Sequence, residues 1–300
     1  MVLEVARIGL EVKPADAAIR LVTDAAHEAF LSGDPGRDCA TVVLATVGPA
    51  RAPRGRGRTV FDTGTVWRLE ETSEGTLLTL RSPLYGAEPY LAVEFDSDYA
   101  VGRGETIEGG PHLLAGTMHP FVYPFDEVVY LARLSRERGV LVHGCGLEWR
   151  GRGILLLGTS GAGKSTSARL WAQRPDVTVL SDDRIVLRAD GEGYRIFGTP
   201  WHGDAGYESN GSAPLEAVFI LEQAPRNRVL DFSSAAAVSQ MMVRAFPAMW
   251  DQRGLEFAVR FLSQLSTRIP VRRLQFLPEA SMIDCVVATL EGDVAAARAR

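Results

Sequence analysis

The residues with the clearest chemical pattern form one stretch, which reads Gly-Thr-Ser-Gly-Ala-Gly-Lys-Ser-Thr from Gly158 to Thr166. This stretch matches the G-x-x-x-x-G-K-[ST] pattern of a phosphate-binding loop. Glycines there allow successive backbone N–H groups to turn toward phosphate oxygens, which side chains would obstruct. We predict that Lys164 contacts the β- and γ-phosphates of ATP and that the Ser165 hydroxyl ligates Mg²⁺. The predicted ATP-binding residues are Gly158, Thr159, Ser160, Gly161, Ala162, Gly163, Lys164, Ser165 and Thr166. The alternative is a structural glycine loop without a ligand.

Two adjacent carboxylates, Asp182 and Asp183, follow the apolar run Val177–Leu180. In open α/β sheets, ligands bind at the carboxyl ends of the strands. One carboxylate can hold Mg²⁺, directly or through water, while the other accepts the proton of an acceptor hydroxyl. We predict that both are catalytic and that Asp182 joins Ser165 as a metal partner, with the choice of base left open. The alternative is a helix or turn cap, a position that aspartate favours.

A histidine lies in the strand before the loop. If Gly151 and Arg152 form the turn between two strands, His143 lies opposite Ser160, at the mouth of the phosphate loop. This register predicts an active-site role for His143. The alternative is a histidine packed in the core.

A second predicted hairpin delivers a loop to the same end of the sheet. Its strands, 184–189 and 194–198, flank the turn Asp190-Gly-Glu-Gly193 and place residues 199–201 opposite Asp182. We predict that Trp201 and His202 contact the acceptor. The alternative for Trp201 is a side chain that seals the core beneath the loop.

The elements that must position these residues are typical of an α/β domain. The apolar run Ile154–Leu157 is predicted as a buried strand before the loop, and Ser165–Gln173 as a helix after it. Phosphates would then lie at a helix N-terminus. Further strands are expected at 215–221 and 271–277, with helices at 255–265 and 281–290. We therefore predict a P-loop kinase domain of the α/β class, with a mixed β-sheet, over residues 121–300.

The preceding residues, 1–120, are predicted to form a smaller β-rich domain of the α+β class. Short β-prone runs alternate with turn residues from Thr59 to Gly102. A helix is expected near Pro14–Phe30, and a basic surface loop at Arg51–Arg58. This domain shows no catalytic pattern.

Composition restricts the function classes. The formal charge of −5 argues against a general nucleic-acid binder. Three scattered cysteines fit a reducing compartment and lack metal-ligand spacing. No apolar stretch reaches the length of a membrane span, and the first residues lack a signal-peptide pattern. We expect a cytoplasmic protein without membrane or nucleic-acid partners, and a homo-oligomer is compatible with the sequence.

The order of these motifs resembles a known family. A strand with His143-Gly144, the phosphate loop and then Ser181-Asp182-Asp183 is similar to the catalytic domain of HPr kinase/phosphorylase, over roughly residues 139–225. That family is structurally related to ATP-dependent phosphoenolpyruvate carboxykinase. The resemblance implies transfer of phosphate from ATP to a serine hydroxyl, with His143 at the active site.

The chain also departs from the family pattern. Thr166 stands where HPr kinases have glutamate, and Gly198–Gly203 replaces their glycine-rich motif. HPr is therefore not the expected acceptor, and the chain looks more like divergent HPr-kinase-related proteins, some of which accompany peptide-modifying systems.

The expected function is an ATP- and Mg²⁺-dependent phosphotransferase acting on a hydroxyl of a peptide, protein or small metabolite. One alternative is a nucleotide sensor that binds ATP without turnover. Another is a carboxykinase-like lyase, which would need a lysine and histidine pair as metal ligands. Lys164 is the only lysine after Lys13, which disfavours the lyase.

Overall fold

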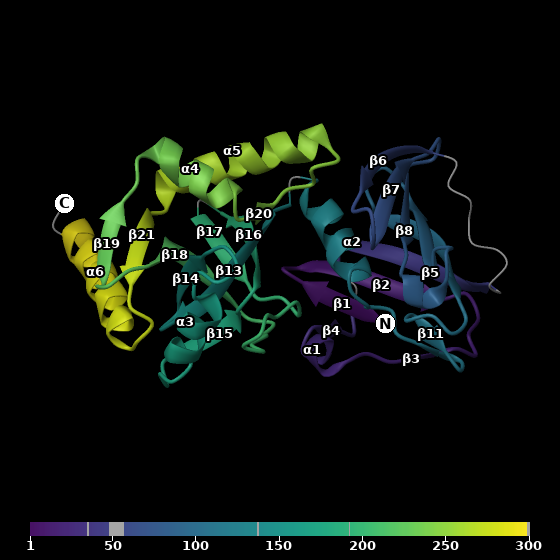
Figure 1. Cartoon of the computed structure of the whole chain (residues 1–300), viewed down its shortest axis with the longest axis horizontal. Helices are drawn as coiled ribbons and strands as arrows, with labels where there is room; N and C mark the ends of the chain where they lie inside the picture. Colours follow the sequence, from purple (N-terminus) through teal and green to yellow (C-terminus); the bar gives the residue numbers. More distant parts are fainter. Residues whose placement is uncertain (35, 48–56, 137, 192, 299–300) are drawn as a thin grey trace. The chain divides into compact units, whose positions relative to one another are not determined.

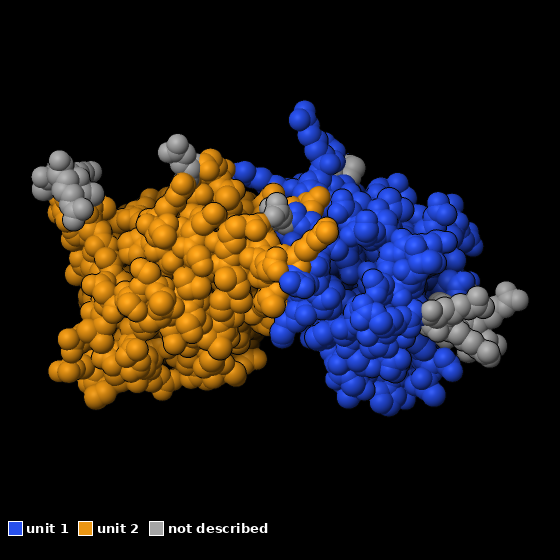
Figure 2. Space-filling view, turned by 90° about the horizontal axis from the view of Figure 1, so that it is seen from above, with its two compact units in different colours: residues 1–136, 248–252 blue, residues 137–247, 253–300 orange. Residues whose placement is uncertain are grey.

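The computed structural model describes residues 1–34, 36–47, 57–136, 138–191 and 193–298. It divides into two compact units, coloured separately in Figure 2. Unit 1 contains residues 1–136 and 248–252, and unit 2 contains residues 137–247 and 253–300. Most of the predicted basic loop Arg51–Arg58 lies outside the described residues.

Unit 1 is built mainly of strands. Its described residues form a nine-stranded sheet in the order β4-β1-β2-β5-β10-β9-β8-β7-β6 (Figure 1). The pairs β2–β5 and β5–β10 are parallel, and the other pairs are antiparallel. The strands are β1 Val2–Val5, β2 Ile8–Pro14, β4 Leu31–Ser32, β5 Cys39–Val47, β6 Arg58–Asp62, β7 Trp67–Glu71, β8 Thr76–Leu80, β9 Leu91–Phe95 and β10 Val101–Ile107.

A smaller sheet and short helices complete unit 1. The small sheet has the order β11-β12-β3 among the described residues. These elements are β3 Arg20–Leu21, β11 Leu113–Leu114, β12 Thr117–Met118, α1 Ala25–Glu28, the 3-10 helix η1 Pro83–Tyr85 and α2 Phe125–Leu134. The helix expected near Pro14–Phe30 is wrong, because β2 continues to Pro14 and a helix begins only after Asp24. The Asp24 carboxylate caps that helix by accepting the His27 N–H, so an apolar spacing of helical type did not form a long helix here.

Two features explain which residues group with unit 1. The Tyr130 hydroxyl of α2 donates to the carbonyl oxygens of Leu3 and Ile8, at 2.7 and 3.1 Å, which ties α2 to the first hairpin. Trp250 packs against Phe61 and Trp67, with ring centroids 5.6 Å apart in each pair. The division at residue 120 remains a prediction, and α2, which that prediction placed in the second domain, lies in unit 1.

Unit 2 contains a mixed sheet that positions the predicted site. Its main order is β14-β13-β16-β17-β18-β21-β19, with β15 and β20 paired to β13 (Figure 1). The parallel pairing of β14 with β18 connects the two halves of this sheet. The strands are β13 Val140–Trp149, β14 Arg152–Leu157, β15 Val177–Ser181, β16 Arg184–Asp190, β17 Gly193–Phe197, β18 Ser212–Gln223, β19 Arg228–Asp231, β20 Ala245–Phe246 and β21 Val271–Phe276.

Helices pack on both faces of the sheet in unit 2. They are α3 Lys164–Trp171, α4 Ser234–Met242, α5 Gln252–Arg268 and α6 Ser281–Arg298. The buried strand β14 separates two hydrophobic clusters, because successive side chains of a strand point to opposite faces. Leu155 and Leu157 lie in the cluster with α4 and α5, whereas Ile154 and Leu156 lie in the cluster with α3 and α6. This two-sided burial explains why the strand before the loop is apolar at every position from 154 to 157.

The first hairpin of unit 2 has a different register from the predicted one. Its turn residues are Arg150 and Gly151, with φ values of 52° and 79°, rather than Gly151 and Arg152. Two central residues with positive φ are typical of a tight hairpin turn. The pairing of Trp149 with Arg152 moves the register by two residues, so His143 does not lie opposite Ser160. The partner of His143 on the neighbouring strand β16 is Arg184.

Candidate active site

The phosphate-loop sequence connects β14 to α3, as its pattern predicts. Gly161 and Gly163 have φ values of 76° and 103°, conformations that side chains other than glycine adopt only rarely. Gly163 precedes the first residue of α3, and a Cβ on it would lie 2.7 Å from Phe276 Cζ. The Gln223 side-chain amide donates to the Gly161 carbonyl at 3.0 Å, so β18 also supports the loop. The backbone conformation therefore favours glycine at both positions, and packing against Phe276 adds a second reason at Gly163.

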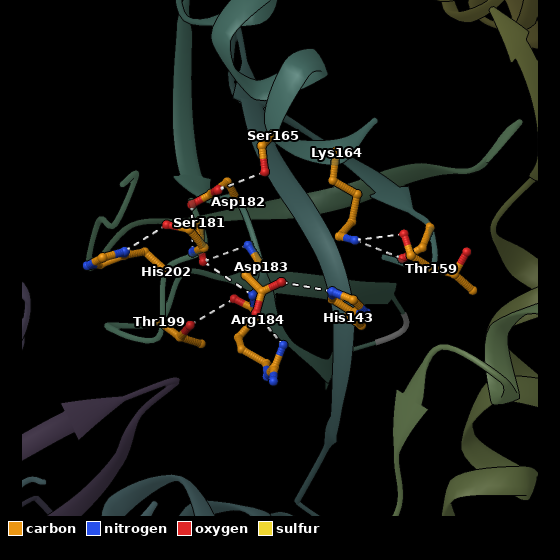
Figure 3. A network of polar contacts seen from close by, with 12 residues as sticks. His143, Thr159, Lys164, Ser165, Ser181, Asp182, Asp183, Arg184, Thr199 and His202 are labelled. Atoms are coloured by element: carbon orange, nitrogen blue, oxygen red, sulfur yellow. Dashed lines mark hydrogen bonds and ion pairs between the residues drawn. The ribbon is translucent and has the colours of Figure 1, made fainter. Parts of the chain in front are cut away.

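Lys164 is largely buried at the start of α3, with 6% of its surface exposed. Its Nζ donates to the Gly158 carbonyl at 3.0 Å and to the Thr159 carbonyl at 3.2 Å (Figure 3). Burial lowers its pKa from the ordinary value, although the nearby Asp183 charge opposes that change. The ammonium group is thus held at the loop where the motif predicts phosphate oxygens.

Asp182 is buried beneath the site and organises the loop that follows β17. Its carboxylate accepts backbone N–H groups from Gly203 and Ala205 at 2.9 Å each and from Tyr207 at 3.3 Å. The Ser165 hydroxyl also donates to it, at 3.4 Å. Because its surface is only 1% exposed, this carboxylate depends on these donors to replace water. Asp182 therefore links the phosphate loop to the segment 203–207.

Asp183 has different surroundings, although it is the next residue. His143 Nε2 donates to Asp183 Oδ1 at 2.8 Å, and the Arg184 guanidinium forms an ion pair with Asp183 Oδ2 (Figure 3). Burial tends to raise the Asp183 pKa, but the His143 hydrogen bond and the Arg184 charge outweigh burial and hold the pKa below its ordinary value. The Arg184 guanidinium in turn lies 4.3 Å from the Phe246 ring centroid. Asp183 is thus an ionised, oriented carboxylate.

These groups meet at one cavity of about 360 Å³ in unit 2. Its lining contains most of the predicted phosphate loop together with His143 and Asp183. The lining residues are His143, Ser160, Gly161, Gly163, Lys164, Ser165, Thr166, Asp183, Gly203, Asp204 and Gln223. Gly158, Thr159 and Ala162 belong to the loop but not to this lining, and Asp182 lies behind it.

The loop after β17 contributes two residues to the cavity, one from the predicted segment and one just beyond it. Gly203 and Asp204 line the cavity, whereas Trp201 is buried and His202 is exposed, and neither belongs to the lining. His202 Nδ1 lies 3.0 Å from the Gly203 carbonyl oxygen. The prediction that Trp201 and His202 contact an acceptor remains a prediction. The second hairpin was predicted to return Thr199–Gly203 to this end of the sheet, so Gly203 lies within that prediction and Asp204 directly follows it.

Gln223 and Arg184 are the other residues that sequence reasoning missed. Gln223 ends β18, which pairs in parallel with β14, so its side chain is at the same strand end as the phosphate loop. The strand order that places it there was not readable from the chain. Arg184 directly follows the acidic pair, and an arginine beside a predicted catalytic carboxylate is a signal that was available.

The cavity offers few protein ligands for a metal ion. Among the described residues, no three or more histidine, cysteine, aspartate or glutamate side chains are grouped so as to hold a metal ion. Ser165 and Asp182 nevertheless place a hydroxyl and a carboxylate oxygen 3.4 Å apart next to the phosphate loop. Mg²⁺ usually takes one or two protein oxygens and completes its shell with phosphate oxygens and water. The residues present therefore fit a Mg²⁺ ion that arrives with a nucleotide.

Comparison with solved structures finds a weak counterpart. The Hpr(Ser) kinase/phosphatase from Coxiella burnetii aligns with 53% of this chain and 96% of its own, at 11% sequence identity and a TM-score of 0.30. This similarity is too low to carry an argument about fold or activity, so the resemblance to HPr kinase remains a prediction. None of the curated proteins matches the sequence. No helix within the described ranges is both long and apolar enough to cross a membrane.

Comparison with protein families gives a clear match. The family described as "SynChlorMet cassette protein ScmC" matches residues 124–276, about half of the chain. The matched range contains the phosphate loop, the acidic pair and His143. This chain therefore belongs to the ScmC family.

Proposed function

We propose that this chain is an ATP- and Mg²⁺-dependent phosphotransferase that moves the γ-phosphate of ATP to a hydroxyl group, with a serine of a peptide or protein as the favoured acceptor and a small metabolite as another. One observation carries this proposal. The phosphate-loop lysine, Lys164, and an oriented, ionised carboxylate, Asp183, line the same cavity. A cation for phosphate and a base for a hydroxyl are the two groups that phosphoryl transfer requires side by side.

Each residue has a defined part in the proposed transfer. The loop and Lys164 bind the phosphates and offset their charge. The acceptor oxygen forms a bond to the γ-phosphorus while the bond to the bridging oxygen of ADP breaks, and Asp183 accepts the hydroxyl proton. His143 donates to one oxygen of Asp183 and Arg184 pairs with the other, so the two groups together orient the carboxylate. Catalysis of this kind consists mainly of positioning and charge neutralisation.

The two adjacent carboxylates take separate roles in this proposal. Asp183 lines the cavity and acts as the base, whereas Asp182 is buried and holds the segment 203–207. Bound Mg²⁺ would neutralise charge on the phosphate oxygens. Ser165 would hold the metal directly. Asp182 would act on it through Ser165 or water, because three backbone N–H groups already occupy its oxygens.

The test is detection of phosphate on an acceptor. The protein is incubated with ATP, Mg²⁺ and a library of serine peptides, and mass spectrometry detects an added phosphate. Asp183→Asn should bind ATP with an affinity close to that of the wild type but lose transfer by about 10²–10⁴-fold. Asp284→Asn is a matched control, because Asp284 is exposed on α6 and outside the cavity lining.

Three results separate the hypotheses. Transfer that is lost in Asp183→Asn and kept in Asp284→Asn supports the kinase. Tight ATP binding without product, for any hydroxyl acceptor tried, supports a nucleotide sensor instead. Absence of ATP binding in calorimetry would overturn the phosphate-loop interpretation itself.

A further inference from the structure

Asp204 is a cavity residue that the proposed transfer chemistry does not use. Its side chain is exposed and lines the cavity beside Gly203. Within the part of the chain that the structure describes, its carboxylate makes no hydrogen bond or ion pair, and only its backbone carbonyl is bonded. A carboxylate that lines a cavity and has no partner within the protein can form an ion pair or hydrogen bond with a ligand in that cavity.

Three hydrogen bonds hold the backbone around Asp204. The N–H groups of its two neighbours, Gly203 and Ala205, both donate to the buried Asp182 carboxylate at 2.9 Å. The Asp204 carbonyl oxygen accepts from Arg169 of α3 at 3.1 Å. Because the backbone is held before a ligand arrives, little backbone entropy is lost when the Asp204 carboxylate binds one.

The other charged groups of the cavity already have partners or a predicted ligand. Asp183 is bonded to His143 and Arg184. Lys164 lies against the carbonyls of the phosphate loop, where ATP phosphates are expected. Asp204 is thus a carboxylate of the lining without an ion pair among the described residues, since the Arg169 guanidinium bonds to its backbone carbonyl and not to its carboxylate.

We propose that Asp204 selects acceptors that carry a positively charged group, an ammonium or a guanidinium, close to the acceptor hydroxyl. This inference rests on the proposed phosphotransfer and names the acceptor chemistry for the same site. Two sources share that chemistry: a serine peptide with an adjacent lysine or arginine, and a small amino alcohol. A carboxylate that lines the same cavity would also repel acidic acceptors.

The expected effect is moderate. An ion pair between exposed groups contributes at most about 1 kcal/mol, which corresponds to roughly a fivefold change in affinity. Because Asp204 attracts a basic acceptor and repels an acidic one, the two should differ by about tenfold in Kd. The difference should shrink at high salt, where mobile ions screen exposed charges.

The experiment measures binding and transfer separately. Three fluorescent nine-residue peptides contain one central serine flanked by arginines, alanines or glutamates, and ethanolamine represents the amino alcohols. Fluorescence anisotropy gives the peptide Kd in the presence of a non-hydrolysable ATP analogue and Mg²⁺, and mass spectrometry follows transfer from ATP. The proteins are the wild type, Asp204→Asn, Asp204→Lys and the control Asp284→Asn.

The basic peptide should bind the wild type and Asp284→Asn about tenfold more tightly than the acidic peptide. Asp204→Asn should remove most of this preference and Asp204→Lys should reverse it. Transfer to ethanolamine, reduced in Asp204→Asn, would identify a small amino alcohol as the source. Phosphorylation of the arginine peptide alone would identify the basic peptide.

Other results overturn the inference. Equal affinity for the three peptides in wild type and Asp204→Asn, with transfer intact, rejects the role of Asp204 while the proposed function stands. An Asp204→Asn variant that loses Mg²⁺-dependent ATP affinity in calorimetry would make Asp204 a metal partner instead. Failure of the proposed function has a different result, which is absence of ATP binding or of transfer for every acceptor. The anisotropy comparison still shows whether Asp204 discriminates peptides by their charge.

Discussion

Replacing Asp182 with asparagine is expected to destabilise unit 2 by about 1–3 kcal/mol and to release the segment 203–207, while the phosphate loop still binds ATP. The substitution keeps the size of the side chain and changes one oxygen into an NH₂ group. It therefore tests whether the buried carboxylate acts through the hydrogen bonds that it accepts.

The magnitude follows from the bonding at each oxygen. Oδ1 accepts from the N–H groups of Gly203 and Tyr207, and Oδ2 accepts from the Ala205 N–H and the Ser165 hydroxyl. An asparagine oxygen can replace only one of these two sets. If it takes the place of Oδ1, its NH₂ group faces the Ala205 N–H and leaves that donor without an acceptor. One such buried donor costs about 1–3 kcal/mol. Asp182→Ala removes every acceptor and should cost more, on the order of 4 kcal/mol. The cost stays below the sum for all four donors, because the released loop can form hydrogen bonds to water instead.

Two measurements test the predicted loss of stability and the release of the segment 203–207. Urea unfolding gives the change in stability, and hydrogen exchange followed by mass spectrometry reports the amides of Gly203, Ala205 and Tyr207. In Asp182→Asn these amides should exchange faster, whereas in Asp183→Asn they should stay protected, since the Asp183 side chain accepts none of them. ATP affinity in Asp182→Asn should remain within a few-fold of wild type, and transfer should fall.

A folded Asp182→Asn protein with unchanged stability and unchanged exchange would refute this reasoning. Faster exchange in both variants to the same extent would also refute it, because the loop would then depend on the acidic pair as a whole. Unchanged exchange together with lost ATP affinity would return Asp182 to a direct metal role.

Three further predictions concern other residues. Lys164→Met should weaken ATP binding by about 10- to 100-fold in calorimetry with the fold kept, because it removes the cation at the loop; unchanged affinity in a folded variant would contradict the proposed site. Gly163→Ala should cost about 1–3 kcal/mol and lower the Tm, because φ is 103° and the new Cβ would meet Phe276; a Tm equal to wild type would show that the loop tolerates a side chain. Burial tends to lower the His27 pKa, but hydrogen bonds to Asp126 and Asp24 outweigh burial and raise the pKa. The stability that His27 gives unit 1 is therefore complete below its unfolded pKa of about 6.5. That stability is lost as the pH rises through the pKa of the folded state. The stability difference between wild type and His27→Gln should therefore shrink with rising pH, and a difference that grows would contradict this assignment.

The elements next to the phosphate loop could be predicted because local signals agree there. An apolar run, a glycine pattern and a helix-forming segment follow one another from Ile154 to Trp171, and β14, the loop and α3 occupy these positions. The expected strand near 271–277 and the helix near 255–265 correspond to β21 and α5. In each of these segments, burial on one or both faces leaves a periodic pattern in the sequence.

The predictions that were wrong depend on a single turn or on a competing cap. The first hairpin turns at Arg150, a residue other than glycine with positive φ, and no sequence rule favours arginine there. The apolar spacing at 14–30 fits a helix, yet the chain continues as β2 to Pro14 and Asp24 caps a helix of one turn. The contribution of Gln223 depends on the pairing of β14 with β18, which are more than fifty residues apart along the chain.

Neighbouring aspartates can be told apart only in three dimensions. Asp182 and Asp183 form the bend between β15, which ends at Ser181, and β16, which begins at Arg184, so their different surroundings follow from the course of this bend and not from a sequence pattern. Asp182 is 1% exposed and bonded to backbone N–H groups, whereas Asp183 lines the cavity and is bonded to His143 and Arg184. Asp182 is poorly placed to accept a proton from an acceptor, because it is buried outside the cavity lining and protonation would break its hydrogen bonds to the segment 203–207. Asp183 is also bonded at both oxygens, to His143 and Arg184, but it lines the cavity, where an acceptor hydroxyl can reach it. The two residues have the same side chain, and the difference in their proposed roles follows from burial, from their hydrogen-bond partners and from access to the cavity.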